Sequence, residues 1–339
     1  MKRIIPVFSM ALLLSSQFIY AQEGKGKEKE GRKKYEFVKE KNISKTYPAS
    51  GNKLSIENSF GHVKFIAWDK SEIKVDVHIE SSSNQEDIAQ KTFDAISVSD
   101  KHQGGEIEFK TSINNKNDKC KNCKSSMQID YEVHLPTSVV LDVENSFGNT
   151  ELPDYSGAVS ISNKFGNLTA GSLSNVKDIV IEFGGATIKS ISNVDATFKF
   201  SKIDIDNLSG KNKINLEFCD ATKINLDNNL TSLNLNESYS TVNINPGNLS
   251  ASYTISTSFG SFVDRTSVGV KRTDTPDKYG PDSDKTFEGK SGNGSAKIDI
   301  HSSFGRIILG EPTAEDMKDK EKKEKSKNKN KSKSGIVHL

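Results

Sequence analysis

The chain has 339 residues, of which only 33% are hydrophobic and 27% are charged. So small an apolar share is typical of a thin, mainly β core and argues against a helix bundle or a parallel α/β core. The net charge of only +2 argues against a nucleic-acid-binding protein. The sequence contains no P-loop, GxSxG or HExxH motif, so it indicates no enzyme, no cofactor and no metal site.

The N-terminus has the features of an export signal. A basic start at Lys2-Arg3 precedes an apolar run through Leu12-Leu13-Leu14, and Ala21 supplies the small residue of a cleavage site. This order is typical of a secretory signal peptide over residues 1–21. The alternative is a retained membrane anchor, but the run is short of the roughly 20 apolar residues that span a bilayer. We therefore expect an exported protein that is periplasmic, on the outer surface or secreted, with no transmembrane segment in the mature chain.

Residues 22–40 follow as a charged segment with almost nothing to bury. Such segments do not offset the entropy lost on ordering, so we expect a disordered linker there. The repeat domain is then expected over residues 41–311.

The dominant pattern of that domain is an alternating apolar run that ends in Phe-Gly. Between Phe147 and Phe218 the aromatic residue recurs every 17 or 18 residues, and a fixed period is typical of a solenoid. We therefore predict a mainly β fold, a right-handed β-solenoid with coils of about 18–20 residues and one short N-terminal helix. The structural repeat residues are Phe60, Gly61, Phe147, Gly148, Phe165, Gly166, Phe183, Gly184, Phe259, Gly260, Phe304 and Gly305.

Within each repeat the alternation shifts by one residue across Phe-Gly. A shift of one residue moves the following side chains to the other face, so the glycine is expected to absorb it with a backbone conformation that other residues avoid. The aromatic residues are expected to form one buried column, in which Phe165→Ala would cost about 3–5 kcal/mol. Asn58, Asn145 and Asn163 are expected to stack as a hydrogen-bonded ladder, with a sugar or ion contact as the alternative.

Two insertions interrupt the repeats. Residues 66–135 are expected to add strands and a helix near residues 84–95, and residues 271–293 are expected to be a long surface loop. The last coil, which ends at Leu309-Gly310, is expected to cap the array. Within the first insertion, Cys120 and Cys123 are a possible disulfide at a hairpin tip, and a redox or metal pair is the alternative.

The C-terminal residues 312–339 are rich in Lys and lack an apolar period. They are expected to be a disordered tail. It acts either as a solvating tether or as a basic arm in weak electrostatic contact with anionic envelope surfaces.

The units LSIENSFGHVKFIAWD at residues 54–69 and IDIHSSFGRIILG at residues 298–310 resemble the putative adhesin family of bacterial envelope proteins. The resemblance covers roughly residues 40–311 and implies glycine-punctuated β-repeats behind a signal peptide. It implies no catalytic residue, because none is associated with the repeat motif in that family.

The repeats without a catalytic motif predict a non-enzymatic, exported, adhesin-like binding module of the bacterial cell envelope. An extended β-sheet face would be presented to an envelope glycan or a protein. Two alternatives stay open: an envelope-stress accessory or sensor protein, and a β-helix glycan-active enzyme that uses two carboxylates of a sheet face.

Overall fold

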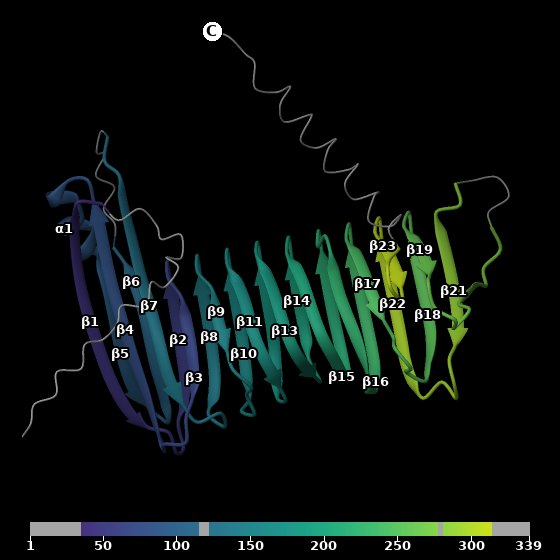
Figure 1. Ribbon diagram of the computed structural model, residues 1–339, viewed down its shortest axis with the longest axis horizontal. Helices are drawn as coiled ribbons and strands as arrows, with labels where there is room; N and C mark the ends of the chain where they lie inside the picture. Colours follow the sequence, from purple (N-terminus) through teal and green to yellow (C-terminus); the bar gives the residue numbers. More distant parts are fainter. Residues whose placement is uncertain (1–34, 115–121, 277–280, 314–339) are drawn as a thin grey trace, which may run out of the picture. The chain divides into compact units, whose positions relative to one another are not determined.

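The computed structural model describes residues 35–114, 122–276 and 281–313. This part of the chain is mainly β, with one helix, and its strands form one large mixed sheet (Figure 1). The elements are β1 (Phe37–Pro48), β2 (Lys53–Ser59), β3 (Val63–Ala67), β4 (Glu72–Ser83), α1 (Glu86–Ala95), β5 (Ile96–Gln103), β6 (Glu106–Ile113), β7 (Ser125–Leu135), β8 (Val140–Ser146), β9 (Thr150–Leu152), β10 (Val159–Lys164), β11 (Asn167–Leu173), β12 (Val176–Glu182), β13 (Gly185–Ser192), β14 (Asp195–Lys199), β15 (Lys202–Glu217), β16 (Thr222–Ser238), β17 (Thr241–Asn245), β18 (Ala251–Ser258), β19 (Ser261–Asp264), β20 (Lys271–Arg272), β21 (Asp284–Lys290), β22 (Ala296–Ser303) and β23 (Arg306–Leu309).

Each repeat contributes one strand segment before its aromatic residue and one after it. The segments before the aromatic pair with one another in parallel, and so do the segments after it. The pairing is in register: Leu141 of β8 lies opposite Val159 of β10, and Asn145 lies opposite Asn163. Along this pair each inward side chain lies on its equivalent in the next repeat, whereas the register shifts within the pairings of β10 with β12 and of β15 with β16.

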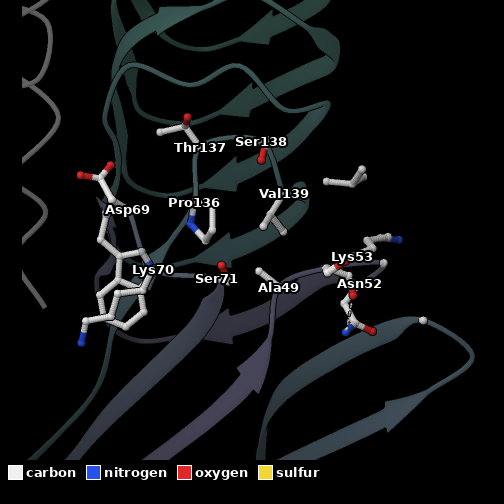
Figure 2. Close-up of a pocket in the computed structure, with 15 residues that line it drawn as sticks. Ala49, Asn52, Lys53, Asp69, Lys70, Ser71, Pro136, Thr137, Ser138 and Val139 are labelled. Carbon is white, nitrogen blue, oxygen red and sulfur yellow. Dashed lines mark hydrogen bonds between the residues drawn. The ribbon is translucent and has the colours of Figure 1, made fainter.

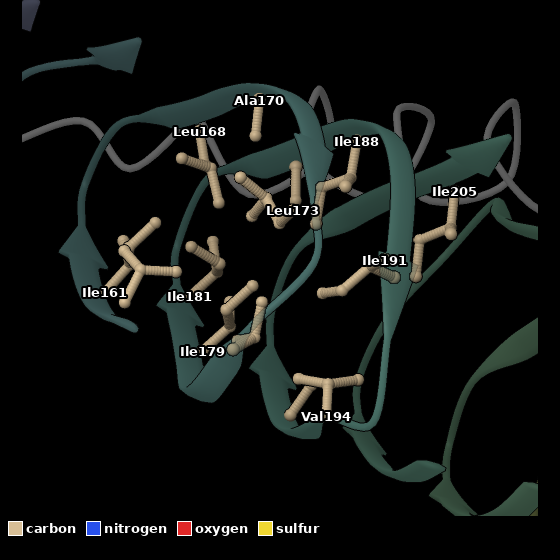
Figure 3. Close-up of a cluster of buried hydrophobic side chains, with 14 of the residues drawn as sticks. Ile161, Leu168, Ala170, Leu173, Ile179, Ile181, Ile188, Ile191, Val194 and Ile205 are labelled. Carbon is tan, nitrogen blue, oxygen red and sulfur yellow. The ribbon is translucent and has the colours of Figure 1, made fainter. Parts of the chain in front are cut away.

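The core is a stack of apolar side chains between the two series of strands (Figure 3). Ile161, Ile181, Ile188 and Ile205 are among its fully buried members. Strands present alternate residues to one face, so the period-two pattern of the sequence supplies this row directly. Because a single repeat cannot enclose its own row, stacking on neighbouring repeats is what buries it.

Antiparallel strands flank both ends of the parallel series. β4 pairs antiparallel with both β1 and β7, and β5 pairs antiparallel with β6. These strands and α1 confirm the expectation for residues 66–135. The expectation of a surface loop over residues 271–293 is wrong in part, because β21 pairs antiparallel with β18 from Ser252 opposite Lys290 to Ser258 opposite Asp284. The physical reason is that β18 would otherwise leave a row of unpaired backbone groups at its edge.

The last repeat does not cap the array, contrary to expectation. β22 lies between β16 and β18, with parallel pairing to both. β23 likewise lies between β17 and β19. The last strands within the described residues are thus inserted between two earlier repeats, and the Phe259 repeat takes the outer place.

Several predicted segments lie outside the described residues: the signal peptide at 1–21, most of the linker and nearly all of the tail. The expected linker boundary at residue 40 differs, since β1 begins at Phe37. Cys120 also lies outside them, so its disulfide with Cys123 stays a prediction. Among the described residues, no helix is long and apolar enough to cross a membrane.

Candidate interaction surface

The most prominent surface feature is a continuous stack of nine aromatic rings, here called the aromatic ridge. Neighbouring ring centroids lie 4.8–5.1 Å apart, and neighbouring ring planes lie within 8° of parallel. All but the first ring have 43–59% of their surface exposed. In order, the ridge contains Phe60, Phe147, Phe165, Phe183, Phe200, Phe218, Tyr239, Phe304 and Phe259. The predicted contacts between neighbouring repeats are present, but the prediction of a buried column is wrong.

The backbone explains why the rings point outward. Each ridge residue has a positive φ, between 50° for Phe200 and 64° for Phe60. A bulky residue rarely adopts this left-handed conformation, which costs about 1–2 kcal/mol. The chain turns its corner at the aromatic residue, so that side chain leaves the inward series. The expectation that the glycine supplies the unusual φ is wrong, because the glycines that follow the rings are absent from the positive-φ positions.

The glycines have a different role, which is close approach between repeats. A Cβ atom at Gly148 would lie 1.8 Å from the carbonyl oxygen of Gly61, and one at Gly184 would lie 1.8 Å from that of Gly166. No side chain fits at such distances. At these positions glycine lets successive corners sit directly on one another. Ser201, Cys219 and Ser240 take its place in later repeats, where the rings stack at the same spacing.

The stacking determines what the ridge can contact. An internal ring such as Phe183 has Phe165 on one face and Phe200 on the other, so only its edge is exposed. Ring edges carry partial positive charge, whereas the faces are negative. A partner therefore contacts ring edges along the middle of the ridge, because the ring faces on which sugars or bases stack are covered there.

The residue before each ring lies on the outer face of its strand and forms a column beside the ridge, here called the flanking column. Four charged residues occupy its middle. Lys164 Nζ lies 3.3 Å from Glu182, and Lys199 Nζ lies 3.2 Å from Glu217. In ridge order the flanking column is Ser59, Ser146, Lys164, Glu182, Lys199, Glu217, Ser238, Ser303 and Ser258. Serine occupies both ends of the flanking column.

Inside the corner, the predicted asparagine ladder is present in part, because Thr150 lies between Asn145 and Asn163 in the chain of hydrogen bonds. Asn58 Nδ2 donates to Asn145 Oδ1 at 3.3 Å, and Asn145 Nδ2 donates to Thr150 Oγ1 at 3.4 Å. Thr150 Oγ1 donates in turn to Asn163 Oδ1 at 2.7 Å. All three asparagines are buried, so these amides satisfy one another and the backbone, and the alternative of a sugar or ion contact is wrong.

Glu237 occupies the same inward position in a later repeat. Its carboxyl accepts hydrogen bonds from Ser302 Oγ and, at 3.1 Å, from the backbone nitrogen of Ser240. Burial raises its pKa to about 7, against the opposing effect of these hydrogen bonds. The sequence contained the signal that was missed: Leu233 and Leu235 are buried, and the period of two places Glu237 on their face.

A hollow of about 780 Å³ opens where several turns meet at one end of the strands. Thr137 and Ser138 line it from the turn before β8, and Asn52 and Lys53 line it from the start of β2 (Figure 2). Trp68 also lines it, and Lys70 Nζ lies 4.7 Å from the centroid of its ring. Hydroxyl, amide and ammonium groups around one indole suit a small polar ligand.

Glu40, His78 and Glu80 come together across β1 and β4, with candidate ligand atoms all within 4.8 Å of one another. No metal-ligand spacing in the sequence indicates them, because only the strand pairing joins residue 40 to residues 78 and 80. His78 Nδ1 lies 2.8 Å from Asn42 Oδ1. Surface carboxylates at such distances are common without an ion, so these three residues do not define a metal site.

Comparisons with known proteins leave the family open. No family model and no curated protein matches the chain. Among solved structures, a putative cell adhesion protein from Clostridium sporogenes is 11% identical over 81% of this chain and 100% of its own, with a TM-score of 0.20. A putative adhesin from Bacteroides fragilis is 11% identical over 79% of this chain and 97% of its own, with a TM-score of 0.37. A putative adhesin from Parabacteroides distasonis is 9% identical over the same shares, with a TM-score of 0.34. Scores this low establish neither a family nor a function.

Removing one ring from the ridge tests its energetics. Phe183→Ala loses two stacking contacts but keeps the unfavourable φ of 58°, so we expect a loss of about 1–2 kcal/mol in the free energy of unfolding. Phe183→Gly loses the same contacts but tolerates that φ, and we expect it to be more stable than Phe183→Ala by about 1 kcal/mol. Denaturant unfolding of both variants measures the difference. A loss of about 3–5 kcal/mol for Phe183→Ala would instead indicate a buried ring.

Proposed function

We propose that the chain is a non-enzymatic, exported binding module of the bacterial cell envelope, built as a right-handed β-solenoid with coils of about 18–20 residues. Its aromatic ridge and the adjoining sheet face bind an envelope glycan or a protein. The parallel, in-register pairing of successive repeats supports the solenoid, and the export signal in the sequence supports the location.

The observation that carries this proposal is the ridge itself. Large contiguous apolar strips on a protein surface mark interaction sites. Here the strip is also regular, because its rings repeat about every 4.9 Å. Each exposed ring edge contributes little alone, so strength comes from many simultaneous contacts along an extended partner. That suits a polymer or another elongated protein better than a small molecule.

The test compares the ridge with the hollow. Phe165→Gly/Phe200→Gly removes two rings at positions whose φ values of 56° and 50° glycine tolerates. Trp68→Ala changes the hollow and leaves the ridge intact. We expect the ridge variant to weaken binding to isolated cell envelopes and to arrayed glycans at least tenfold, and Trp68→Ala to have no effect.

Unchanged binding by the ridge variant would contradict the proposal, and loss with Trp68→Ala alone would move the site to the hollow. The same preparations are incubated with the bound glycans to look for shortened chains. Turnover by the full chain would show that the protein is a glycan-active enzyme and not a binding module.

A further inference from the structure

We propose that the aromatic ridge pairs with the ridge of a second copy of this chain in antiparallel orientation, forming a two-fold symmetric dimer. The proposal rests on the proposed function in one respect, namely that the ridge is a binding surface, and it names the partner. Three observations carry it: the spacing of the rings, the exposure of edges and not faces, and the order of charges in the flanking column.

The spacing limits which partners fit the whole length. A line of ring edges repeating about every 4.9 Å is set by the distance between neighbouring strands. Another β-stack has the same period, so contact made at one ring is repeated at every ring. Contact with a second ridge also removes the exposed apolar surface of both sets of rings from water.

The flanking column matches itself when it is reversed. Place a two-fold axis across the ridge between Phe183 and Phe200. Lys164 then faces Glu217 of the second copy, and Glu182 faces Lys199 of the second copy. Beyond these residues serine meets serine, as Ser146 meets Ser238 and Ser59 meets Ser303. An isologous interface requires this self-complementarity, because each surface must match its own reversed copy.

The opposite side of the ridge is compatible with the same axis. The residues two positions after the rings are exposed at Asn167, Lys202 and Asp220. Antiparallel pairing brings Lys202 to Gly185 of the second copy and Asp220 to Asn167, so no like charges meet there.

Parallel pairing is disfavoured by the same residues. A two-fold axis along the ridge brings the flanking column of one copy against the opposite side of the other. In register, Lys199 then meets Lys202 and Glu217 meets Asp220. Like charges placed together in this way oppose association, so the charge order selects the antiparallel form.

Sedimentation velocity of the full chain over a micromolar concentration range tests the pairing. We expect a reversible monomer–dimer equilibrium. Glu182→Lys/Glu217→Lys makes the middle of the flanking column all Lys, and Lys164→Glu/Lys199→Glu makes it all Glu. Each variant alone should dissociate at least tenfold more readily, whereas an equal mixture of the two should restore the dimer. Because these side chains are partly exposed, we expect the substitutions to leave the fold intact. An unchanged melting temperature of each monomeric variant checks this.

Orientation is tested with single cysteines. Ser146→Cys and Ser238→Cys chains, one of them enlarged by a tag, are mixed and treated with a short thiol cross-linker. Antiparallel pairing gives the mixed product above the background of the full chain. Parallel pairing would place Ser146 against Asn149 of the second copy, two positions after Phe147. Cross-linking of Ser146→Cys chains to Asn149→Cys chains would therefore overturn the proposal, as would the absence of any product between Ser146→Cys and Ser238→Cys chains.

The outcomes separate this proposal from the proposed function. A full chain that stays monomeric at every concentration, but binds envelopes through its ridge, overturns the self-pairing and leaves the proposed function standing. If the charge variants lose the dimer but envelope binding does not depend on the ridge, the self-pairing stands and the proposed function is overturned.

Discussion

Gly166→Ala is expected to lower the free energy of unfolding by at least about 3 kcal/mol. The reason is steric, because a Cβ atom at Gly166 would lie 1.9 Å from the carbonyl oxygen of Gly148. That oxygen belongs to backbone held by the pairing of neighbouring strands, so it cannot move without separating two repeats. The Phe147 and Phe165 rings, whose centroids lie 4.8 Å apart, would separate with them.

Gly260→Ala is the matched control, since it changes the same Phe-Gly motif. A Cβ atom there would lie 3.0 Å from the carbonyl oxygen of Gly305, a contact that a small shift relieves. We expect this variant to cost less than half as much as Gly166→Ala. Denaturant unfolding of both variants measures the difference, and equal losses would show that the motif needs glycine for some reason other than close approach.

The local part of the fold was predictable from the sequence. The inward positions of Leu141, Val143 and Asn145 follow from alternation alone, because a strand places every second side chain on one face. The period then places each repeat on the next, and the asparagine ladder follows from equal positions in neighbouring repeats. Each of these inferences needs only residues near one another in the chain.

The direction of the rings was not predictable in the same way. An alternating run that ends in Phe suggests a buried Phe, and nothing near Phe165 in the sequence shows that its φ is positive. The same positive φ occurs at Phe200, Phe218 and Tyr239. Ser201, Cys219 and Ser240 follow these rings, so the conformation is not tied to the glycine of the motif. The recurring glycine was expected to have the positive φ, but the aromatic residue before it has it. Close approach between repeats and positive φ both favour glycine, so the sequence pattern alone does not distinguish them.

The order of the last strands also lacked a sequence signal. Tyr253, Ile255 and Thr257 present nearly the same inward pattern as Ile298, Ile300 and Ser302. The inward side chains of β18 and of β22 would therefore pack equally well beside β16. Only the three-dimensional arrangement shows that β22 takes that place. The flanking column, by contrast, can be read from the sequence once the rings are known to lie outside.

Replacing the buried acid should change the pH dependence of stability. The pKa of Glu237 is raised by burial to about 7 in the folded protein, whereas an unfolded chain releases this proton near pH 4.3. Between these values the folded state holds more protons than the unfolded state, so stability falls as pH rises from about 4 to about 7 and stays lower above it. The full contribution is about 4 kcal/mol, from about 1.4 kcal/mol for each pH unit.

Glu237→Gln is expected to remove this dependence and to make the protein more stable at pH 8 by as much as about 4 kcal/mol. The glutamine has nearly the same shape, its oxygen can accept from the Ser240 backbone nitrogen, and its amide can donate to Ser302 Oγ. Glu151→Gln is the control, because Glu151 is exposed and its replacement should leave the pH profile unchanged. Chemical denaturation at pH 5 and pH 8 measures both variants. If Glu237→Gln and the full chain lose the same stability between these two values, then Glu237 is ionised in the folded protein throughout this range. Its burial would then be compensated by some other group in the column that contains Ser302.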